Sequence, residues 1–366
     1  MFNRLVIICF FLFTNSSYAE KNLTFTKFKV LLDKEVPSIL KKNNAPGISI
    51  AIVEGQNLIG IFSYGVADIQ NKQPISEETL FNVGSISKVV TSWGVMKLVA
   101  DGKIELDEPI NKYLIRWKIP KSSFNADKVT LRNILTHTSG LSLGPYNGWD
   151  TSDDLPTIVE SLQGNNTGDG VVKLIHEPNT KWLYSGGGYS VVQLLIEDVS
   201  GVSFAKFMTD NILSPLGMKN SSFEISSVNA AKLAKPHDKN GKETTMVYFV
   251  ETAAAGLLTT TSDLAKFNQA VLRDAKGAFI GSNLLSTSLI EEMVKPAPHT
   301  GGRWSMSYVV DSENKSLGFA GFNRGWTSLT RSITDKNIGY VILNNSSVGA
   351  ANNEVDNVLL SSIREN

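Results

Sequence analysis

The sequence predicts an α+β fold: a mostly antiparallel sheet flanked by helices, with an all-α subdomain inserted into it. Strand-like runs of apolar residues occur near the start of the chain and return after Val247, whereas the stretch between them has helical periodicity. Because helices and strands are segregated along the chain, we expect sheet parts at about 24–80 and 245–366 and a helical insert at about 85–240. A site between these parts would lie in a natural cleft.

The elements follow from local patterns taken in order. Apolar residues at helical spacing predict a helix over 24–43, and a polar turn at 54–57 joins predicted strands at 47–53 and 58–64. Further helices are expected at 85–101, 131–136, 187–200 and 203–213. Residues 141–170 are rich in Gly, Asn, Asp and Ser and predict a long loop at the rim of a site. Four more strands are expected at 304–310, 315–320, 325–333 and 337–344, before a closing helix at 350–363.

Residues 1–19 are interpreted as a secretory signal peptide. Arg4 supplies a positive charge, residues 5–13 form an apolar core too short to span a bilayer, and Ser17, Tyr18 and Ala19 form a cleavage site. The domain would then occupy residues 20–366, in a secreted or periplasmic protein. The alternative is an uncleaved membrane anchor. The single cysteine, Cys9, lies in this segment, so the mature chain would have no disulfide.

Composition argues against several classes of function. The 35 basic and 35 acidic residues balance and form no basic block, so no nucleic-acid partner is expected. No second apolar run reaches membrane-spanning length once the signal is removed. The four histidines are scattered without ligand spacing, so we expect no metal and no cofactor.

The sequence S-x-x-K points to a nucleophile. It occurs four times, at Ser38, Ser85, Ser203 and Ser312. Only Ser85 follows an extended segment and a glycine and opens an apolar helix. Lys88 would lie one turn further along the same helix face, where its amine can take the hydroxyl proton of Ser85. Free N–H groups at the helix start would stabilise an oxyanion beside that hydroxyl.

Several segments together resemble the serine β-lactamase and penicillin-binding-protein superfamily, in its class C β-lactamase, DD-peptidase and esterase branch. The resemblance covers about residues 25–366. The matching segments are FNVGSISK at 81–88, LTHTSGL at 135–141, WLYSGGGY at 182–189, AGLLTTTSDL at 255–264 and GFNRGW at 321–326. It implies the β-lactamase/transpeptidase-like fold, with the nucleophile between an α/β sandwich and an all-α subdomain.

The resemblance also implies roles for single residues. Ser85 is the acylated nucleophile, Lys88 its proton acceptor, and Tyr184 the second-motif tyrosine that relays a proton. The backbone N–H groups of Ser85 and Phe322 form the oxyanion hole. His137 is interpreted as a turn residue rather than a catalytic base.

Two departures from the family pattern concern substrate binding. Gly186 replaces the asparagine of the usual Tyr-x-Asn motif, and the usual Lys- or His-x-Gly motif is Phe319-Ala320-Gly321. Gly186, Phe319 and Gly321 are therefore the expected substrate-binding positions. Two residues are alternative sources of the missing cation or imidazole, namely His299 and Arg324.

These observations predict an exported serine hydrolase of carboxypeptidase or esterase type that acts through an acyl-enzyme on Ser85. The substrate would be an ester or amide: a D-amino-acid peptide such as a cell-wall peptide, a small ester or, weakly, a β-lactam. The alternative is a catalytically weak or silent penicillin-binding-like protein that binds cell-wall peptides. The intact set of Ser85, Lys88 and Tyr184 favours the enzyme, and Phe319 and Gly186 favour the alternative.

Overall fold

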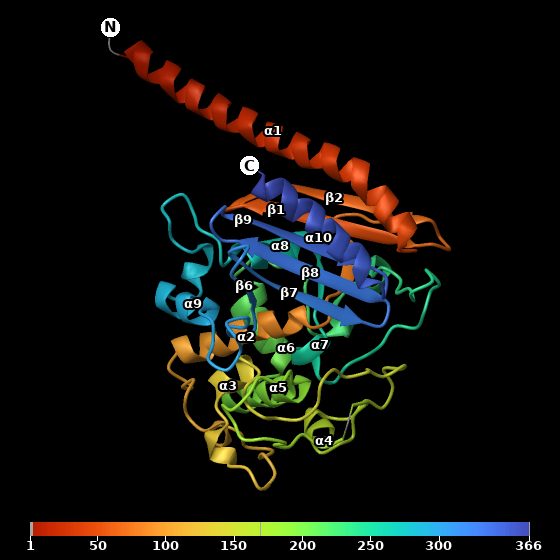
Figure 1. Ribbon diagram of the computed structural model, residues 1–366, viewed down its shortest axis with the longest axis vertical. Helices are drawn as coiled ribbons and strands as arrows, with labels where there is room; N and C mark the ends of the chain where they lie inside the picture. The colour runs from red at the N-terminus through yellow and green to blue at the C-terminus, as the bar shows by residue number, and fades with distance from the viewer. Residues whose placement is uncertain (1–2, 169, 366) are drawn as a thin grey trace.

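A computed structural model describes residues 3–168 and 170–365, with side chains from Leu23 onward. A seven-stranded antiparallel sheet forms one half of the molecule, with the strand order β3-β2-β1-β9-β8-β7-β6 (Figure 1). The strands are β1 (Gly47–Glu54), β2 (Asn57–Asp68), β3 (Gln73–Pro74), β6 (Val309–Asp311), β7 (Ser316–Asn323), β8 (Trp326–Ile333) and β9 (Ile338–Asn344).

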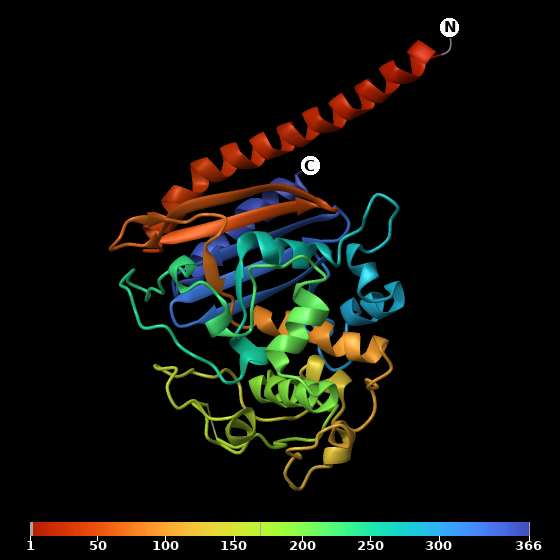
Figure 2. The ribbon, with the colours of Figure 1, turned by 180° about the vertical axis from the view of Figure 1, so that it is seen from behind.

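Both faces of this sheet are buried, and the central strands show why. In β1, Ile48, Ile50 and Ile52 face one hydrophobic core, whereas Ala51 and Val53 face another. The first core is closed by α1 (Asn3–Lys42) and α10 (Gly349–Arg364). Figure 2 shows the opposite face, where α8 (Thr261–Gln269) packs against the sheet. Central strands buried on both sides therefore read as continuous apolar runs.

The second half of the molecule is helical and lies below the sheet in Figures 1 and 2. Its main helices are α2 (Ile86–Ala100), α3 (Leu131–Leu135), α4 (Ile158–Leu162), α5 (Gly186–Ser200), α6 (Phe204–Met208) and α7 (Thr252–Ala255), and α9 (Thr287–Val294) lies beside the sheet edge. Helix α2 is buried along almost its whole length, as an apolar helix in the centre of a domain should be. It joins the helical half to the sheet.

A second, small sheet connects the two halves. Strand β4 (Leu80–Asn82) pairs with β5 (Leu258–Thr260), and Leu257 accepts a further hydrogen bond from the Val83 N–H at 3.1 Å. The sequence indicated an extended segment before Ser85 but did not predict β5 or this pairing, because each strand has only three residues. This pairing matters because it fixes the chain just before α2 begins.

The predicted α+β fold with a helical insert is confirmed, with local corrections. The prediction of a strand over 304–310 is wrong except at its end, because Ser307 takes a left-handed conformation (φ 71) and its N–H donates to the Leu135 carbonyl. The predicted helix over 203–213 divides into α6 and a π-helical turn at Thr209–Leu213. The first helix begins at Asn3 rather than at 24.

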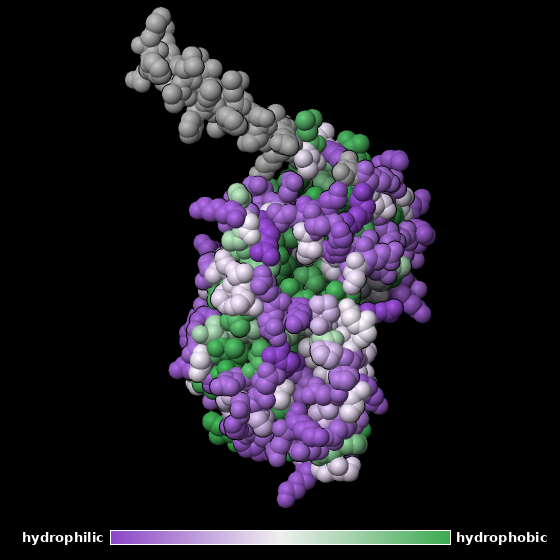
Figure 3. Space-filling model, turned by 60° about the vertical axis from the view of Figure 1, so that its left-hand side comes forward, coloured by the Kyte–Doolittle hydropathy of each residue, from purple (hydrophilic) through white to green (hydrophobic). Residues whose placement is uncertain are grey.

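The predicted signal peptide at 1–19 lies outside the residues whose side chains are described. In the described part of the chain, none of the helices combines the length and apolarity needed to cross a membrane. The face seen in Figure 3 is mostly hydrophilic, and the hydrophobic side chains on it form several separate groups, including one at its centre and one at its left side.

Candidate active site

Ser85 stands at the junction of the two halves, as the N-cap residue of α2. The preceding residue, Gly84, has a φ of +50, and a Cβ there would lie 2.7 Å from the Phe322 nitrogen and 2.8 Å from its oxygen. Only glycine combines this conformation with such close passage of another backbone. The Gly84 N–H donates to Asn82 Oδ1 at 2.9 Å, which stiffens the turn further.

Two side chains from different elements donate hydrogen bonds to the Ser85 hydroxyl. Lys88 Nζ, one turn along α2, lies 3.1 Å from Ser85 Oγ. Tyr184 lies just before α5, and its hydroxyl is 2.7 Å from the same Ser85 Oγ. Ser85 is partly exposed, whereas Lys88 is only 2% exposed. The structure therefore brings together all three residues that the sequence assigned to catalysis and leaves Ser85 partly exposed.

The Lys88 amine is held from several sides. Its Nζ donates to the carbonyl of Ala254 in α7 at 2.7 Å. It also lies 5.0 Å from the ring centroid of Tyr184 and 5.6 Å from that of Tyr189, within cation–π range. Sequence reasoning missed this carbonyl ligand, because helix α7 is too short to produce a recognisable pattern and was not predicted.

The proposed oxyanion hole depends on how closely β7 approaches the start of α2. The Phe322 backbone passes against Gly84, and a Cβ at Gly321 would lie 2.0 Å from the Val83 carbonyl oxygen. Ser328 Oγ, on the neighbouring strand β8, donates to the same carbonyl at 2.8 Å. The Phe322 residue is 60% exposed. The backbone of Phe322 therefore lies directly against Gly84, the residue before Ser85.

An aromatic wall formed by Phe319, Trp304 and Trp182 adjoins Tyr184, at the position where the resemblance predicted the third-motif cation to be missing. Phe319 is 6% exposed and packs edge-on against Trp304 at 5.4 Å between ring centroids. Trp304 also lies 6.3 Å from Tyr184 and 5.1 Å from Trp182. Both tryptophans are partly exposed. Sequence reasoning missed Trp304, because it placed this residue in a regular strand.

Gly186 does not line the site as expected. It is buried as the first residue of α5, and its N–H donates to the carbonyls of Leu143 and Gly144. A Cβ at this position would lie 2.4 Å from the Gly144 oxygen. The loop that begins at Leu141 therefore occupies the space that an asparagine side chain would need, and Gly186 is a packing position.

Neither alternative source of a cation stands free beside Ser85. His299 is exposed and borders a separate cavity of about 810 Å³, which Arg132, Thr138 and Asn179 also line. Arg324 pairs with Asp150 in the 141–170 loop and donates to Thr245 Oγ1 at 3.2 Å. Arg324 therefore links the β7–β8 turn to this loop.

His137 lies deep behind Tyr184. Its ring centroid is 4.5 Å from that of Tyr184 and 5.5 Å from that of Tyr189. Burial, reinforced by the charge of Lys88, lowers the pKa of His137 to about 3. The imidazole is therefore neutral at ordinary pH.

Comparison with known proteins gives a family match over most of the chain. The family model described as Beta-lactamase matches residues 32–364. A protein named Beta-lactamase from Pseudomonas fluorescens is 28% identical over 300 residues, which cover 80% of this chain and 74% of that protein. Protein flp of Staphylococcus aureus strain N315 is 29% identical over 246 residues, 64% of this chain. The chain spans only 47% of the length of flp.

Solved structures show the same fold. A class C beta-lactamase matches with a TM-score of 0.74 at 22% identity, over 92% of this chain and 96% of that one. The D-alanine carboxypeptidase AmpC from Burkholderia cenocepacia gives 0.72 at 21% identity, over 92% and 99%. An octameric penicillin-binding protein homologue from Pyrococcus abyssi gives 0.71 at 26% identity, over 86% and 73%.

Among the residues with described side chains, no cluster of three or more His, Cys, Asp or Glu side chains is arranged to hold a metal ion. The side-chain groups that contact the Ser85 hydroxyl are the Lys88 amine and the Tyr184 phenol.

Proposed function

Because the chain belongs to the beta-lactamase family, we propose that it is an exported serine hydrolase that forms a covalent acyl-enzyme on Ser85. One observation carries the proposal: Ser85 Oγ lies within hydrogen-bond distance of both Lys88 Nζ (3.1 Å) and the Tyr184 hydroxyl (2.7 Å). A nucleophile with a base in direct contact, and a second proton-carrying group beside it, is the arrangement that acyl transfer needs.

In the proposed reaction, Ser85 Oγ attacks the carbonyl carbon of an ester or amide. The hydroxyl proton passes to Lys88 in its neutral amine form, and the carbonyl π electrons move to the oxygen. The N–H groups of Ser85 and Phe322 would stabilise this oxyanion. When the tetrahedral intermediate collapses, Tyr184 donates a proton to the leaving alcohol or amine and regains one from Lys88. Water then attacks the ester on Ser85 by the same route in reverse, which releases the acid and the free serine.

The aromatic wall supports a preference for uncharged substrates, such as small neutral esters or amides of D-amino-acid peptides. Phe319 and Trp304 offer apolar surface but no cation to a substrate carboxylate. Lys88 is not available to pair with a substrate carboxylate, because it is buried and its Nζ already donates to Ser85 and Ala254. Substrates with a free carboxylate, including penicillins, would therefore be processed poorly.

The test is covalent labelling with a fluorophosphonate, followed by intact-mass spectrometry. The wild-type protein should gain one adduct, and Ser85→Ala should gain none. Ser203→Ala is the matched control, because Ser203 is also a helix N-cap followed at the same spacing by a lysine. Labelling that survives in Ser85→Ala and disappears in Ser203→Ala would overturn the assignment.

A second function is a binding protein for cell-wall peptides that turns over slowly or not at all. The observation that favours it is the replacement of the third-motif cation by the packed pair Phe319 and Trp304. Such a protein would bind D-amino-acid peptides yet release no product, and it would give no fluorophosphonate adduct.

Export is proposed from residues 1–19 alone. Arg4, the apolar run 5–13 and the small-residue site ending at Ala19 are the supporting features. Mature protein isolated from outside the cytoplasm should begin near Glu20. N-terminal sequencing that finds Met1 on the accumulated protein would contradict the proposal.

A further inference from the structure

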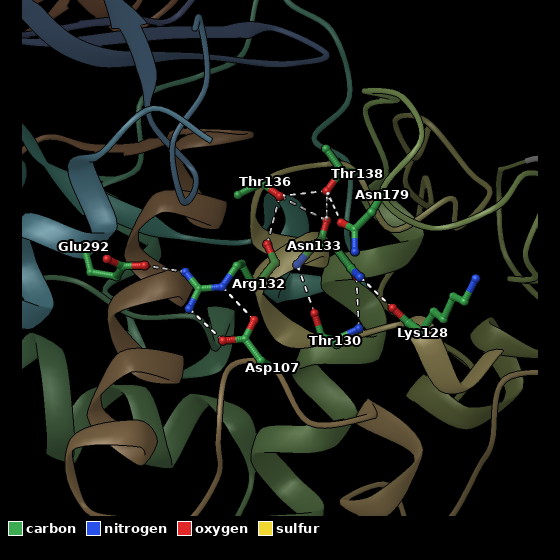
Figure 4. A network of polar contacts seen from close by, with 9 residues as sticks. All are labelled: Asp107, Lys128, Thr130, Arg132, Asn133, Thr136, Thr138, Asn179 and Glu292. Atoms are coloured by element: carbon green, nitrogen blue, oxygen red, sulfur yellow. Dashed lines mark hydrogen bonds and ion pairs between the residues drawn. The ribbon is translucent and has the colours of Figure 1, made fainter. Parts of the chain in front are cut away.

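A buried turn lies directly behind Tyr184, and polar contacts fix its shape. His137 occupies a left-handed conformation (φ 58) just after α3. The hydroxyls of its neighbours, Thr136 and Thr138, are hydrogen-bonded to each other at 2.9 Å, and Thr136 also donates to the Arg132 carbonyl. Figure 4 shows the Thr136 and Thr138 side chains converging, with Asn179 beside Thr138. The backbone on both sides of His137 is therefore held in place.

His137 in turn holds the chain on both sides of Tyr184. Its carbonyl oxygen accepts the Leu183 N–H at 2.7 Å, and its Nδ1 accepts the Ser185 N–H at 3.2 Å. Its ring lies against the Tyr184 ring with an interplanar angle of 36°. His137 thus holds the N–H groups of both neighbours of Tyr184, Leu183 and Ser185, and packs against one face of its ring.

The second of these bonds requires an uncharged imidazole. A neutral ring that accepts at Nδ1 carries its hydrogen on Nε2, whereas a charged ring has no acceptor nitrogen. The groups facing the ring are Lys88 from α2, Tyr184, Tyr189 from α5, and the two tryptophans of the aromatic wall. Because the lone pair on Nδ1 is already engaged, His137 is not free to accept a proton from Ser85.

We propose that His137 is a positioning residue that holds the Tyr184 hydroxyl against Ser85. Its catalytic consequence rests on the function proposed above, whereas its effect on the backbone does not. Loss of the side chain would leave the Ser185 N–H without its acceptor and would remove the imidazole ring that packs against Tyr184 at 4.5 Å between ring centroids. A displacement of about 1 Å at a reacting group costs about 10²-fold in rate.

The test compares two substitutions at this position. Both Gly and Asn tolerate a positive φ, so neither adds backbone strain. His137→Asn keeps a side-chain oxygen close to the place of Nδ1, and His137→Gly removes the acceptor. His237→Asn is the control for loss of a buried imidazole, because His237 is fully buried in the sheet half and its Nδ1 contacts the Asn345 carbonyl at 3.0 Å.

Amide hydrogen exchange reads out the positioning without any need for activity. Exchange of the Ser185 N–H should rise in His137→Gly and stay low in His137→Asn and His237→Asn. An unchanged Ser185 N–H in His137→Gly would overturn the inference, even if the protein proves to be no enzyme.

The acylation rate supplies the second readout in a double-mutant cycle with Tyr184→Phe. His137→Gly should slow labelling about 10²-fold in the wild-type background but have almost no further effect once the Tyr184 hydroxyl is absent. If His137→Gly slows labelling equally in both backgrounds, its role is general packing and the inference is wrong. Absence of any labelling in the wild-type protein would instead refute the proposed function, and the exchange data would still decide the positioning role.

Discussion

Substitution of Gly84 by alanine should separate catalysis from folding. At φ +50 an alanine costs about 1–2 kcal/mol of stability from backbone strain alone. Its Cβ would also lie 2.7 Å from the Phe322 nitrogen, so β7 must retreat by about 0.7 Å to restore ordinary contact at 3.4 Å. That nitrogen would be the second donor of the proposed oxyanion hole. Because an oxyanion donor is worth about 10²–10³ in rate, we expect acylation to fall at least about 10²-fold.

Gly102 provides the matched control for Gly84. It has a φ of +66, and no atom lies within 4 Å of a Cβ built on it. Gly102→Ala should therefore lose only the strain energy and label at the wild-type rate. Urea unfolding measures the stability of both variants, and the time course of fluorophosphonate labelling measures their acylation. If Gly84→Ala labels at the wild-type rate and is no less stable than Gly102→Ala, the assigned contact with Phe322 does not matter.

Three further predictions concern the base, the aromatic wall and the buried imidazole. Lys88→Ala and Lys88→Arg should each cut acylation by about 10²–10⁴, and a wild-type rate in Lys88→Ala would exclude this residue as the base. Phe319→His should raise the ratio of activity on a free acid to that on its methyl ester by roughly 10- to 100-fold, since a charged hydrogen bond contributes about 1.5–3 kcal/mol. His299→Ala should leave this ratio unchanged. A ratio that changes in His299→Ala and not in Phe319→His would mean that His299 serves the site. Acid should destabilise the protein as the pH falls from about 6.5 towards 3, because His137 is protonated in the unfolded chain but not in the folded state, where its pKa is lowered. His137→Asn should flatten this part of the curve of unfolding free energy against pH, and an unchanged slope would contradict the prediction.

Local sequence patterns were enough to predict the contact between Ser85 and Lys88, because both residues lie at the start of one helix. Ser85 and Lys88 meet because helix geometry places residues three apart on one face. The apolar runs of β1 and β9 predicted strands for a similar reason, and the structure places both in the centre of the sheet, where burial on both faces leaves nearly every position apolar. Tyr184 required a different argument, because its contact with Ser85 joins segments 99 residues apart; it was found only through the resemblance of its motif.

The parts that sequence reasoning missed depend on long-range contacts. Residues 304–310 read as a strand by composition, yet Ser307 donates its N–H to Leu135 and Met306 donates to Met293. These long-range contacts outweigh the strand propensity of residues 304–310, and Trp304 consequently packs against Phe319 in the aromatic wall. Gly186 was misassigned for the same kind of reason: the carbonyl that fills its side-chain space comes from Gly144, at a place no pattern reveals.

Trapping the acyl-enzyme itself tests the central claim most directly. Wild-type protein mixed with a small neutral ester and quenched in acid should show an added acyl group, and peptide mapping should place it on Ser85. Tyr184→Phe should form this adduct more slowly, and Ser85→Ala should form none while remaining folded. An acyl group on any other residue, or hydrolysis of the ester by Ser85→Ala at the wild-type rate, would contradict the account.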